Sequence, residues 1–184
     1  MKKILVTGPI LSRSGYGEHA RFVMRSLRDR EDVELFAEPL RWGQTGWIYE
    51  NTEERRWLDS IFARTAEYRM HGGTFDISCQ VTIPPEWRNL APVNIGITAG
   101  VETSTVPVEW LKIANQIDKI IVTSEHTANG FLKSVYPVLD EGGNILKGME
   151  IFCKTPVEVI GFPAILAQKV ISEEVKKSLE EKLQ

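Results

Sequence analysis

Short apolar runs alternate along this chain with longer segments of helical periodicity. The runs are rich in β-branched residues and are bounded by polar, glycine or proline residues, which is typical of strands. Nearly continuous runs, such as Lys-Ile-Ile-Val-Thr at 119–123, suit strands that are covered on both faces, as in a parallel sheet. We therefore expect strands at residues 4–7, 33–37, 76–81, 93–98, 119–123 and 157–160.

The first helical segment runs from Gly17 onward. By their spacing, the residues after Gly17 form an apolar stripe and a set of arginines on the remaining faces. The arginines of this segment, Arg21 among them, occupy faces other than the apolar one. The apolar stripe at i, i+3, i+4 and i+7 consists of Ala20, Val23, Met24 and Leu27.

Capping signals place further helices. Asn51 and Glu54 have the spacing of a capping box, which would begin a helix through the residues that follow. Pro107 is suited to begin a short helix. Ser124 and Ser172 are suited to cap two more.

This alternation predicts an α/β fold: a single Rossmann-like, doubly wound domain with a mainly parallel sheet and helices on both faces. We expect it to span residues 1–184, with a C-terminal helix at 172–184. Residues 137–156 fit the pattern poorly, although 140–144 is typical of a turn or exposed loop.

Composition narrows the function classes. The length of 184 residues suits one well-buried domain, and a formal net charge of −3 gives no reason to expect nucleic acid or an anionic membrane as a partner. Cys79 and Cys153 are too few and too distant for a disulfide framework or a zinc site, so we expect a reduced, cytoplasmic setting. No apolar stretch approaches the roughly 18 residues of a membrane span. No His, Asp or Glu cluster has the spacing of a metal site.

The segment GPILSRSGYGEHARFV, at residues 8–23, directly follows the first predicted strand. Ligands of doubly wound proteins bind outside the carboxyl ends of the strands. Gly15 and Gly17 would let the backbone approach a ligand, and the N–H groups that open the next helix favour an anion. The same glycines also suit a tight connection that binds nothing. We expect ligand contact here.

A dinucleotide is the first candidate ligand, because Val6-Thr7-Gly8 resembles short-chain dehydrogenases and Glu38 is placed to bind a ribose. Two observations count against it. Six residues separate Gly8 from Gly15, where that resemblance requires three, and no tyrosine has a lysine four positions on. A P-loop is excluded, since no Gly-Lys-Ser/Thr follows.

A second glycine-containing loop, RWGQTGWIY at residues 41–49, carries Trp42 and Trp47. Such a pair is suited to stack on a sugar ring, and it is equally suited to anchor the loop to the domain. Both interpretations stay open.

Three segments give a family resemblance: SGYGEHARFVMRSL at 14–27, NIGITAGVETSTVPVEWL at 94–111 and IDKIIVTSEHTANGFL at 117–132. In this order they resemble the amino-terminal domain of GT-B glycosyltransferases of the family-4 type, over residues 1–165. The matching positions are Gly15, Gly17, Glu102, Thr103, Pro107, Glu109, Trp110, Ser124 and Glu125.

The resemblance implies half of a GT-B fold, namely the acceptor-binding half of a sugar transferase. Its partners would be a sugar acceptor and a nucleotide sugar, the latter as co-substrate, and it needs no other cofactor. Such a step requires a stabilised diphosphate leaving group and a positioned acceptor hydroxyl. The resemblance implies Glu102 as the catalytic residue. The implied substrate-binding residues are Gly15, Tyr16, Gly17, His19, Thr103, Ser124, Glu125 and His126.

The sequence also departs from that family. Glu173 and Glu181 have the E-x7-E spacing of the donor-binding half, but no glycine-rich loop precedes them. Ala99-Gly100 stands where many relatives carry a histidine. We therefore expect the donor-binding half to be supplied by a separate chain, to lie in sequence beyond these residues, or not to be needed. Self-association of this chain into a homo-oligomer is a further expectation. A non-catalytic binding module on the same half-fold and an NAD(P)-dependent oxidoreductase remain as alternatives.

Overall fold

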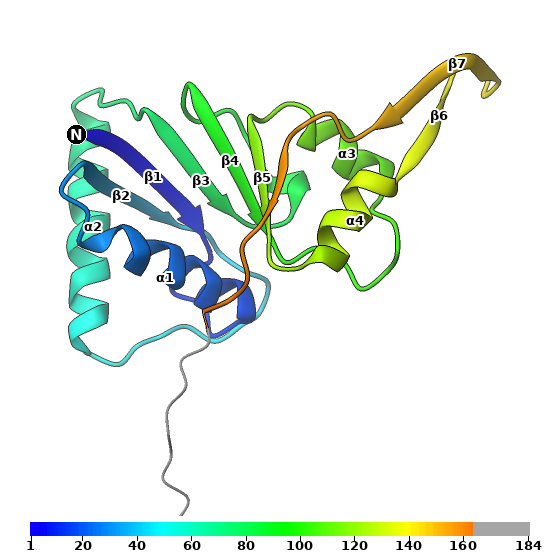
Figure 1. Ribbon diagram of the computed structural model, residues 1–184. Helices are drawn as coiled ribbons and strands as arrows, with labels where there is room; N and C mark the ends of the chain where they lie inside the picture. The colour runs from blue at the N-terminus through cyan, green and yellow to red at the C-terminus, as the bar shows by residue number, and fades with distance from the viewer. Residues whose placement is uncertain (164–184) are drawn as a thin grey trace, which may run out of the picture.

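The computed structural model describes residues 1–163, and its centre is one parallel sheet (Figure 1). The strand order is β2-β1-β3-β4-β5-β8. This confirms the predicted Rossmann-like α/β fold, with strands close to the expected positions. The helix expected at 172–184, with Glu173 and Glu181, lies outside the described residues. The strands are β1 Lys2–Gly8, β2 Val33–Pro39, β3 Ile77–Val81, β4 Val93–Thr98, β5 Lys119–Val122 and β8 Val157–Val159.

The chain winds in two directions from β1. The β1–β2 connection runs one way along the sheet, and the connections from β3 to β8 run the other way. Because such crossovers are right-handed, the two sets of helices cover opposite faces. Helix α1 (Gly15–Arg28) packs on one face, and α3 (Val108–Ala114), α4 (Glu125–Lys133) and the short helix η1 (Pro84–Glu86) pack on the other.

Helix α2 (Glu53–Met70) lies along β2 at the edge of the sheet (Figure 1). Its first turns meet α1, where the Arg28 guanidinium lies 4.9 Å from the centre of the Trp57 ring. Its last turns reach the opposite face of the sheet, where Tyr68 stacks on Phe36 at 4.6 Å between ring centres. The helix therefore closes this edge against both layers.

Successive residues of the central strands enter different cores. Val6 belongs to the cluster under α1, whereas Leu5 packs with Phe36 and Phe75 on the other face. On β5, the fully buried Ile120 joins the cluster of α3 and α4. The near-continuous apolar runs in the sequence reflect this burial on both faces.

Arg21 is the main correction to the predicted pattern of α1. It lies outside the apolar stripe, yet only 5% of the residue is exposed. Its Nη1 donates hydrogen bonds to the carbonyl oxygens of Ile10 (2.7 Å) and Ser12 (3.0 Å). The loop between β1 and α1 folds back over the helix, and a helical-wheel argument does not contain that loop.

The Arg21 guanidinium is also paired with Glu18, at 2.6 Å between Nη2 and the carboxylate. Burial raises the pKa of Glu18, but hydrogen bonds from Arg25 and Arg21 outweigh it and hold that pKa below its ordinary value. The carboxylate therefore stays charged beside the two arginines at neutral pH, so the buried guanidinium keeps its counter-ion.

Helix caps agree with the sequence at two places and differ at two. Ser124 caps α4 by accepting from the Thr127 N–H at 3.2 Å, and Pro107 directly precedes α3, both as expected. Helix α1 begins at Gly15, two residues early, because Ser14 caps it. The cap expected for α2 is wrong. Thr52 caps this helix by accepting a hydrogen bond from the Arg55 N–H, and the Glu54 carboxylate forms an ion pair with Arg25. Asn51 and Glu54 therefore form no capping box.

Residues 135–152 form a two-stranded antiparallel hairpin, which we call the arm. Its strands are β6 (Val135–Leu139) and β7 (Ile145–Phe152), and it projects from the body between α4 and β8 (Figure 1). The predicted turn at 140–144 is confirmed. The Asp140 carboxylate accepts from the N–H groups of Gly142 and Asn144, at 2.9 and 2.8 Å.

The sequence contains no clear strand signal for the arm. Gly148 adopts a positive φ of 79°, and the pairing register shifts between Pro137 and Leu139. These irregularities interrupt the alternation by which strands are recognised. Across residues 1–163, no helix has the length and apolar character needed to cross a membrane.

The two glycines of the first loop should differ sharply under substitution. A Cβ at Gly17 would lie 2.1 Å from the Ser12 carbonyl oxygen, whereas a Cβ at Gly15 would meet nothing within 4 Å. We expect Gly17→Ala to lower the free energy of unfolding by about 1–3 kcal/mol through overpacking. Gly15→Ala should leave it unchanged or raise it slightly. Urea unfolding of both variants measures this, and equal stabilities would contradict the packing described.

Candidate functional site

The strand order reverses between β1 and β3, and beside this point a hollow of about 240 Å³ opens at the carboxyl edge of the sheet. Such reversals are where open α/β sheets bind ligands. We call this space the edge hollow. It is lined by Ser14, Gly15, Tyr16, His19, Trp42, Ala99 and Phe162.

Tyr16 joins α1 to the end of β4 and forms one wall of the edge hollow. Its hydroxyl is hydrogen-bonded to Thr98 Oγ1 at 2.8 Å and accepts from the Ala99 N–H at 3.2 Å. Its ring lies 4.9 Å from that of Trp42, centre to centre. Two tethered aromatic rings thus provide an apolar surface at the rim.

His19 lies deeper, and only 8% of it is exposed. Its ring lies 4.6 Å from that of Phe162. Its Nδ1 is buried and has no hydrogen-bond partner among the described residues. Burial lowers the pKa of His19, so the imidazole is neutral at pH 7. An unpaired buried nitrogen is costly, so His19 Nδ1 is a polar atom that the described residues leave unsatisfied.

The first turn of α1 supplies donors. Gly15 and Tyr16 are the first two residues of the helix, so their N–H groups have no acceptor within it. The helix dipole adds partial positive charge at this end. No side chain stands over Gly15, since the space around its missing Cβ is open. This corner suits a ligand oxygen, charged or neutral.

Of the site residues inferred from the sequence, Gly15, Tyr16 and His19 line the edge hollow. Gly17 does not, because it is buried against the Ser12 carbonyl. The tryptophan pair divides its roles. Trp42 lines the hollow, whereas Trp47 packs on the core beneath α1.

The other inferred residues stand at the same edge of the sheet but do not line the edge hollow. Glu102 and Thr103 are exposed in the loop that follows β4, and Thr103 Oγ1 donates to the Thr105 carbonyl at 2.8 Å. Ser124 caps α4, and its hydroxyl is engaged there. Glu125 and His126 are exposed on the first turn of that helix.

Two lining residues were missed by sequence reasoning. Phe162 follows the last strand in a stretch without a motif, and only the path of residues 160–163 toward α1 brings it to His19. Ala99 stands where many members of the family resembled in sequence carry a histidine. Its place in the edge hollow follows from its contact with Tyr16. No local pattern identifies either residue.

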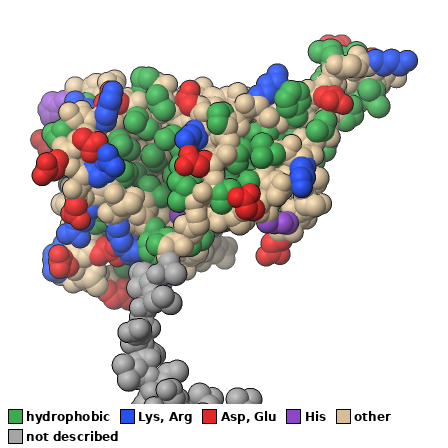
Figure 2. Space-filling view, viewed as in Figure 1, with side chains coloured by type: hydrophobic (Ala, Val, Ile, Leu, Met, Phe, Trp, Pro, Cys, Tyr) green, Lys and Arg blue, Asp and Glu red, His purple; other side chains and the backbone are tan. Residues whose placement is uncertain are grey.

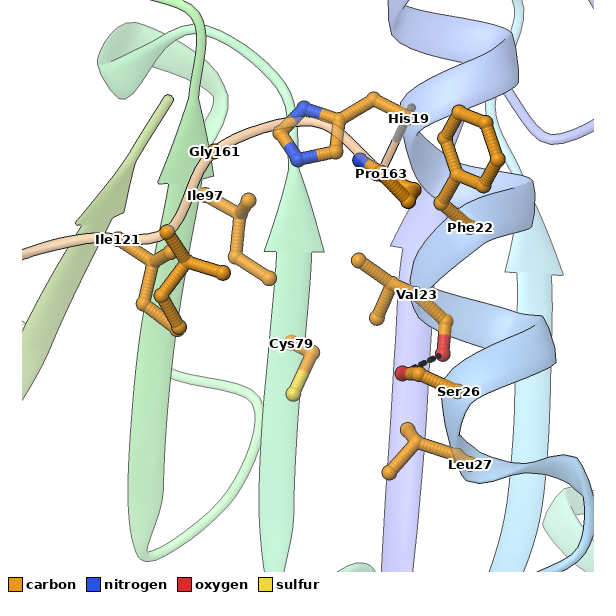
Figure 3. Close-up of a pocket in the computed structure, with 11 residues that line it drawn as sticks. His19, Phe22, Val23, Ser26, Leu27, Cys79, Ile97, Ile121, Gly161 and Pro163 are labelled. Atoms are coloured by element: carbon orange, nitrogen blue, oxygen red, sulfur yellow. Dashed lines mark hydrogen bonds between the residues drawn. The ribbon is translucent and has the colours of Figure 1, made fainter. Parts of the chain in front are cut away.

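A second, apolar space borders the first, and we call it the apolar groove. It measures about 390 Å³ and lies on the α1 face of the sheet, with Cys79, Ile97 and Ile121 as its floor (Figure 3). His19 contributes to both spaces. Figure 2 shows the hydrophobic side chains gathered on this face. The remaining lining residues are Phe22, Val23, Ser26, Leu27, Ile160, Gly161 and Pro163.

The apolar groove exists because of the winding described above. The crossovers from β3 to β8 place their helices on the opposite face, so within residues 1–163 only α1, with the first turns of α2 at the β2 edge, covers this side with helix. The apolar groove has few polar groups to offer a ligand. The Ser26 hydroxyl already donates a hydrogen bond to the Val23 carbonyl at 2.8 Å. The edge hollow is therefore the candidate site.

Residues 1–163 contain no group of three or more His, Cys, Asp or Glu side chains arranged to hold a metal ion. Comparison of the chain with protein-family models, with curated proteins and with solved structures gives no match.

The reactivity of the Cys79 thiol measures how far solvent reaches the floor of the apolar groove. Burial raises the pKa of this thiol to about 12. At pH 8 its thiolate fraction is then roughly 10⁻⁴, against roughly a quarter for an ordinary cysteine. In a Cys153→Ser variant we expect a disulfide reagent to label the native protein about a thousandfold more slowly than the urea-unfolded protein. Fast labelling in the native state would show that the floor of the groove is open to solvent.

Proposed function

We propose that this domain is the acceptor-binding half of a glycosyltransferase that uses a nucleotide sugar, and that the edge hollow holds the sugar-bearing substrate. One observation carries the proposal. The edge hollow combines two aromatic rings with the unpaired N–H groups of a helix N-terminus, at the reversal of strand order.

The aromatic part and the hydrogen-bonding part of the edge hollow suit the apolar and the polar surfaces of a sugar. The C–H faces of a pyranose ring pack on aromatic rings, here those of Tyr16 and Trp42. Hydroxyl or phosphate oxygens would accept from the N–H groups of Gly15 and Tyr16.

Transfer requires the acceptor hydroxyl to be held against the donor sugar rather than a strong nucleophile on the protein. Glu102 is the proposed catalytic carboxylate, in the loop that leaves β4. That loop is held at its start, where Thr127 Oγ1 donates to the Ala99 carbonyl at 2.8 Å. Thr103, Ser124, Glu125 and His126 would form the rim that meets a donor-binding domain.

The oxidoreductase alternative depends on Glu38 as the ribose acid. This carboxylate forms an ion pair with the Arg69 guanidinium of α2, so it already has a partner. The observation favours the sugar-binding proposal over a nicotinamide dinucleotide. A non-catalytic binding module would use the same edge hollow and differs only in lacking a transfer step.

A ligand titration tests the proposal. We expect sugar acceptors, and nucleotide sugars whose phosphates reach the N-terminus of α1, to shift the backbone amide signals of Gly15 and Tyr16 and the indole signal of Trp42, while NADH leaves them unchanged. Gly15→Val would place two methyl groups in the open corner and should weaken binding at least about tenfold, or ~1.4 kcal/mol.

Gly46→Ala is the matched control, because a Cβ there meets only the Arg13 side chain at 3.8 Å and Gly46 does not line the edge hollow. Saturable NADH binding without a response to sugar acceptors or nucleotide sugars would overturn the proposal in favour of the oxidoreductase. Sugar binding with no transfer, tested together with a donor-binding domain, would favour the binding module.

A further inference from the structure

The α1 face of the sheet is only partly covered within residues 1–163. The sheet is parallel throughout, and parallel sheets are normally covered on both faces. On the opposite face, Ile120 and Val122 of β5 pack in the cluster of α3 and α4. On the α1 face, Ile97 of β4 and Ile121 of β5 lie in the floor of the apolar groove, beside α1 (Figure 3). Among the described residues, this strip of sheet therefore lacks a covering layer.

The strip has the dimensions of one helix. Its floor spans the neighbouring strands β3, β4 and β5 and is therefore about 10 Å wide. Packed helices lie about 8–10 Å apart, so one further helix fits beside α1. Strand β4 has six residues and is about 20 Å long, which a helix of about 13 residues matches. The wall that α1 presents to this helix includes the apolar residues Phe22, Val23 and Leu27.

The chain itself leads to this strip. After β8 it crosses toward α1 (Figure 1), and Ile160 and Pro163 line the apolar groove. Between them, the Phe162 ring lies 4.6 Å from that of His19, centre to centre. The described part of the chain therefore ends at the rim of the apolar groove, beside the first turns of α1, and residue 164 continues from there.

The sequence that continues there has the pattern of a helix with one apolar face. An apolar stripe, spaced by four residues, consists of Ile171, Val175, Leu179 and Leu183. The remaining faces of such a helix carry Glu173, Glu174, Lys176, Lys177, Glu180 and Glu181. All these positions lie outside the described residues, and the pattern is a property of the sequence. It predicts a helix that needs an apolar surface on one side and water on the other.

We propose that residues 164–184 cover the apolar groove, and that the helix expected at 172–184 lies beside α1 with its apolar stripe on the floor. A helix that runs back across the sheet from the rim is parallel to α1 and antiparallel to the strands, as is usual for helices on a doubly wound sheet. Residues 164–171 can span up to about 25 Å, so this helix can begin at the carboxyl edge of the sheet. Its charged faces then point to solvent.

The covalent connection favours this segment over a separate molecule. A segment joined to its binding surface by a short connection has an effective concentration on the order of 1 mM. The chemistry of the apolar groove also suits an apolar stripe, because no Asp, Glu, Lys or Arg side chain lines it. Only His19 lines both the apolar groove and the edge hollow. The inference therefore goes beyond the proposed function and does not depend on it.

Disulfide trapping tests the position of the segment. In a chain with Cys79→Ser and Cys153→Ser, Leu27→Cys is combined with either Leu183→Cys or Glu181→Cys. Leu27 lines the apolar groove near the end of α1, and a parallel helix brings its own last turn to the same level. There Leu183 faces the groove, whereas Glu181 points away from it. We expect the pair with Leu183→Cys to form an intramolecular disulfide at least about tenfold faster than the pair with Glu181→Cys.

Thiol labelling tests the cover itself. In the same cysteine-free background, Ile121→Cys places a thiol on the floor of the apolar groove, at a half-buried position. Val175→Gln with Leu179→Gln should raise the labelling rate of this thiol at least about tenfold, because two apolar side chains of the stripe are lost. Lys177→Gln with Glu180→Gln is the matched control. It adds the same two glutamines on the charged faces at unchanged net charge, so the labelling rate should stay the same.

Equal trapping of Leu183→Cys and Glu181→Cys overturns the proposal, and so does a disulfide that forms only between two chains. A labelling rate of Ile121→Cys that the two glutamines on the apolar stripe leave unchanged also overturns it. Circular dichroism checks that each variant is folded, and the trapping experiment decides alone if the stripe variant unfolds. Neither experiment includes a ligand of the edge hollow, so a failure of the proposed function would leave both results unchanged.

Discussion

The buried guanidinium of Arg21 fixes the loop on which the candidate site is built. The loop between β1 and α1 has no regular structure, and its carbonyl groups at Ile10 and Ser12 point inward, where they need donors. Arg21 supplies both hydrogen bonds, and Gly17 lets the loop approach the helix. The Ser12 hydroxyl then bonds Thr45 Oγ1 at 2.6 Å, and Thr45 Oγ1 contacts the Trp42 carbonyl at 2.7 Å. The Trp42 wall of the edge hollow therefore depends on one buried charge.

A buried arginine is costly unless its charge is compensated. Glu18 provides the compensation one turn earlier on the same helix, and Arg25 carries the interaction on to Glu54 of α2. The arrangement links the loop, α1 and α2 through charged groups at the surface and a guanidinium below it. Stability of the fold and geometry of the site are thus maintained by the same contacts.

Sequence reasoning found what depends on local pattern. Strands covered on both faces show as apolar runs, and Ser124 caps α4 as its position predicts. What depends on contacts between distant segments was not predictable: the burial of Arg21, the choice of Trp42 over Trp47, and the approach of Phe162 to His19. The inferred site residues that lie together, Gly15, Tyr16 and His19, are those that one helix turn brings together. Those on separate loops share an edge of the sheet and not a cavity.

The arm begins and ends at the same place. Val135 directly follows the α4 cap residue Ser134, and it pairs with Phe152, the last residue of the arm. The path from α4 to β8 would therefore be almost the same if the hairpin were shortened, since a two-residue turn could close it further back. The register of β8 against β5 does not involve the arm. This stretch of sequence can lengthen, shorten or change its chemistry without disturbing the sheet, whereas the loop before α1, held at nearly every position, cannot. Related chains would then diversify by exchanging arms on an unchanged body.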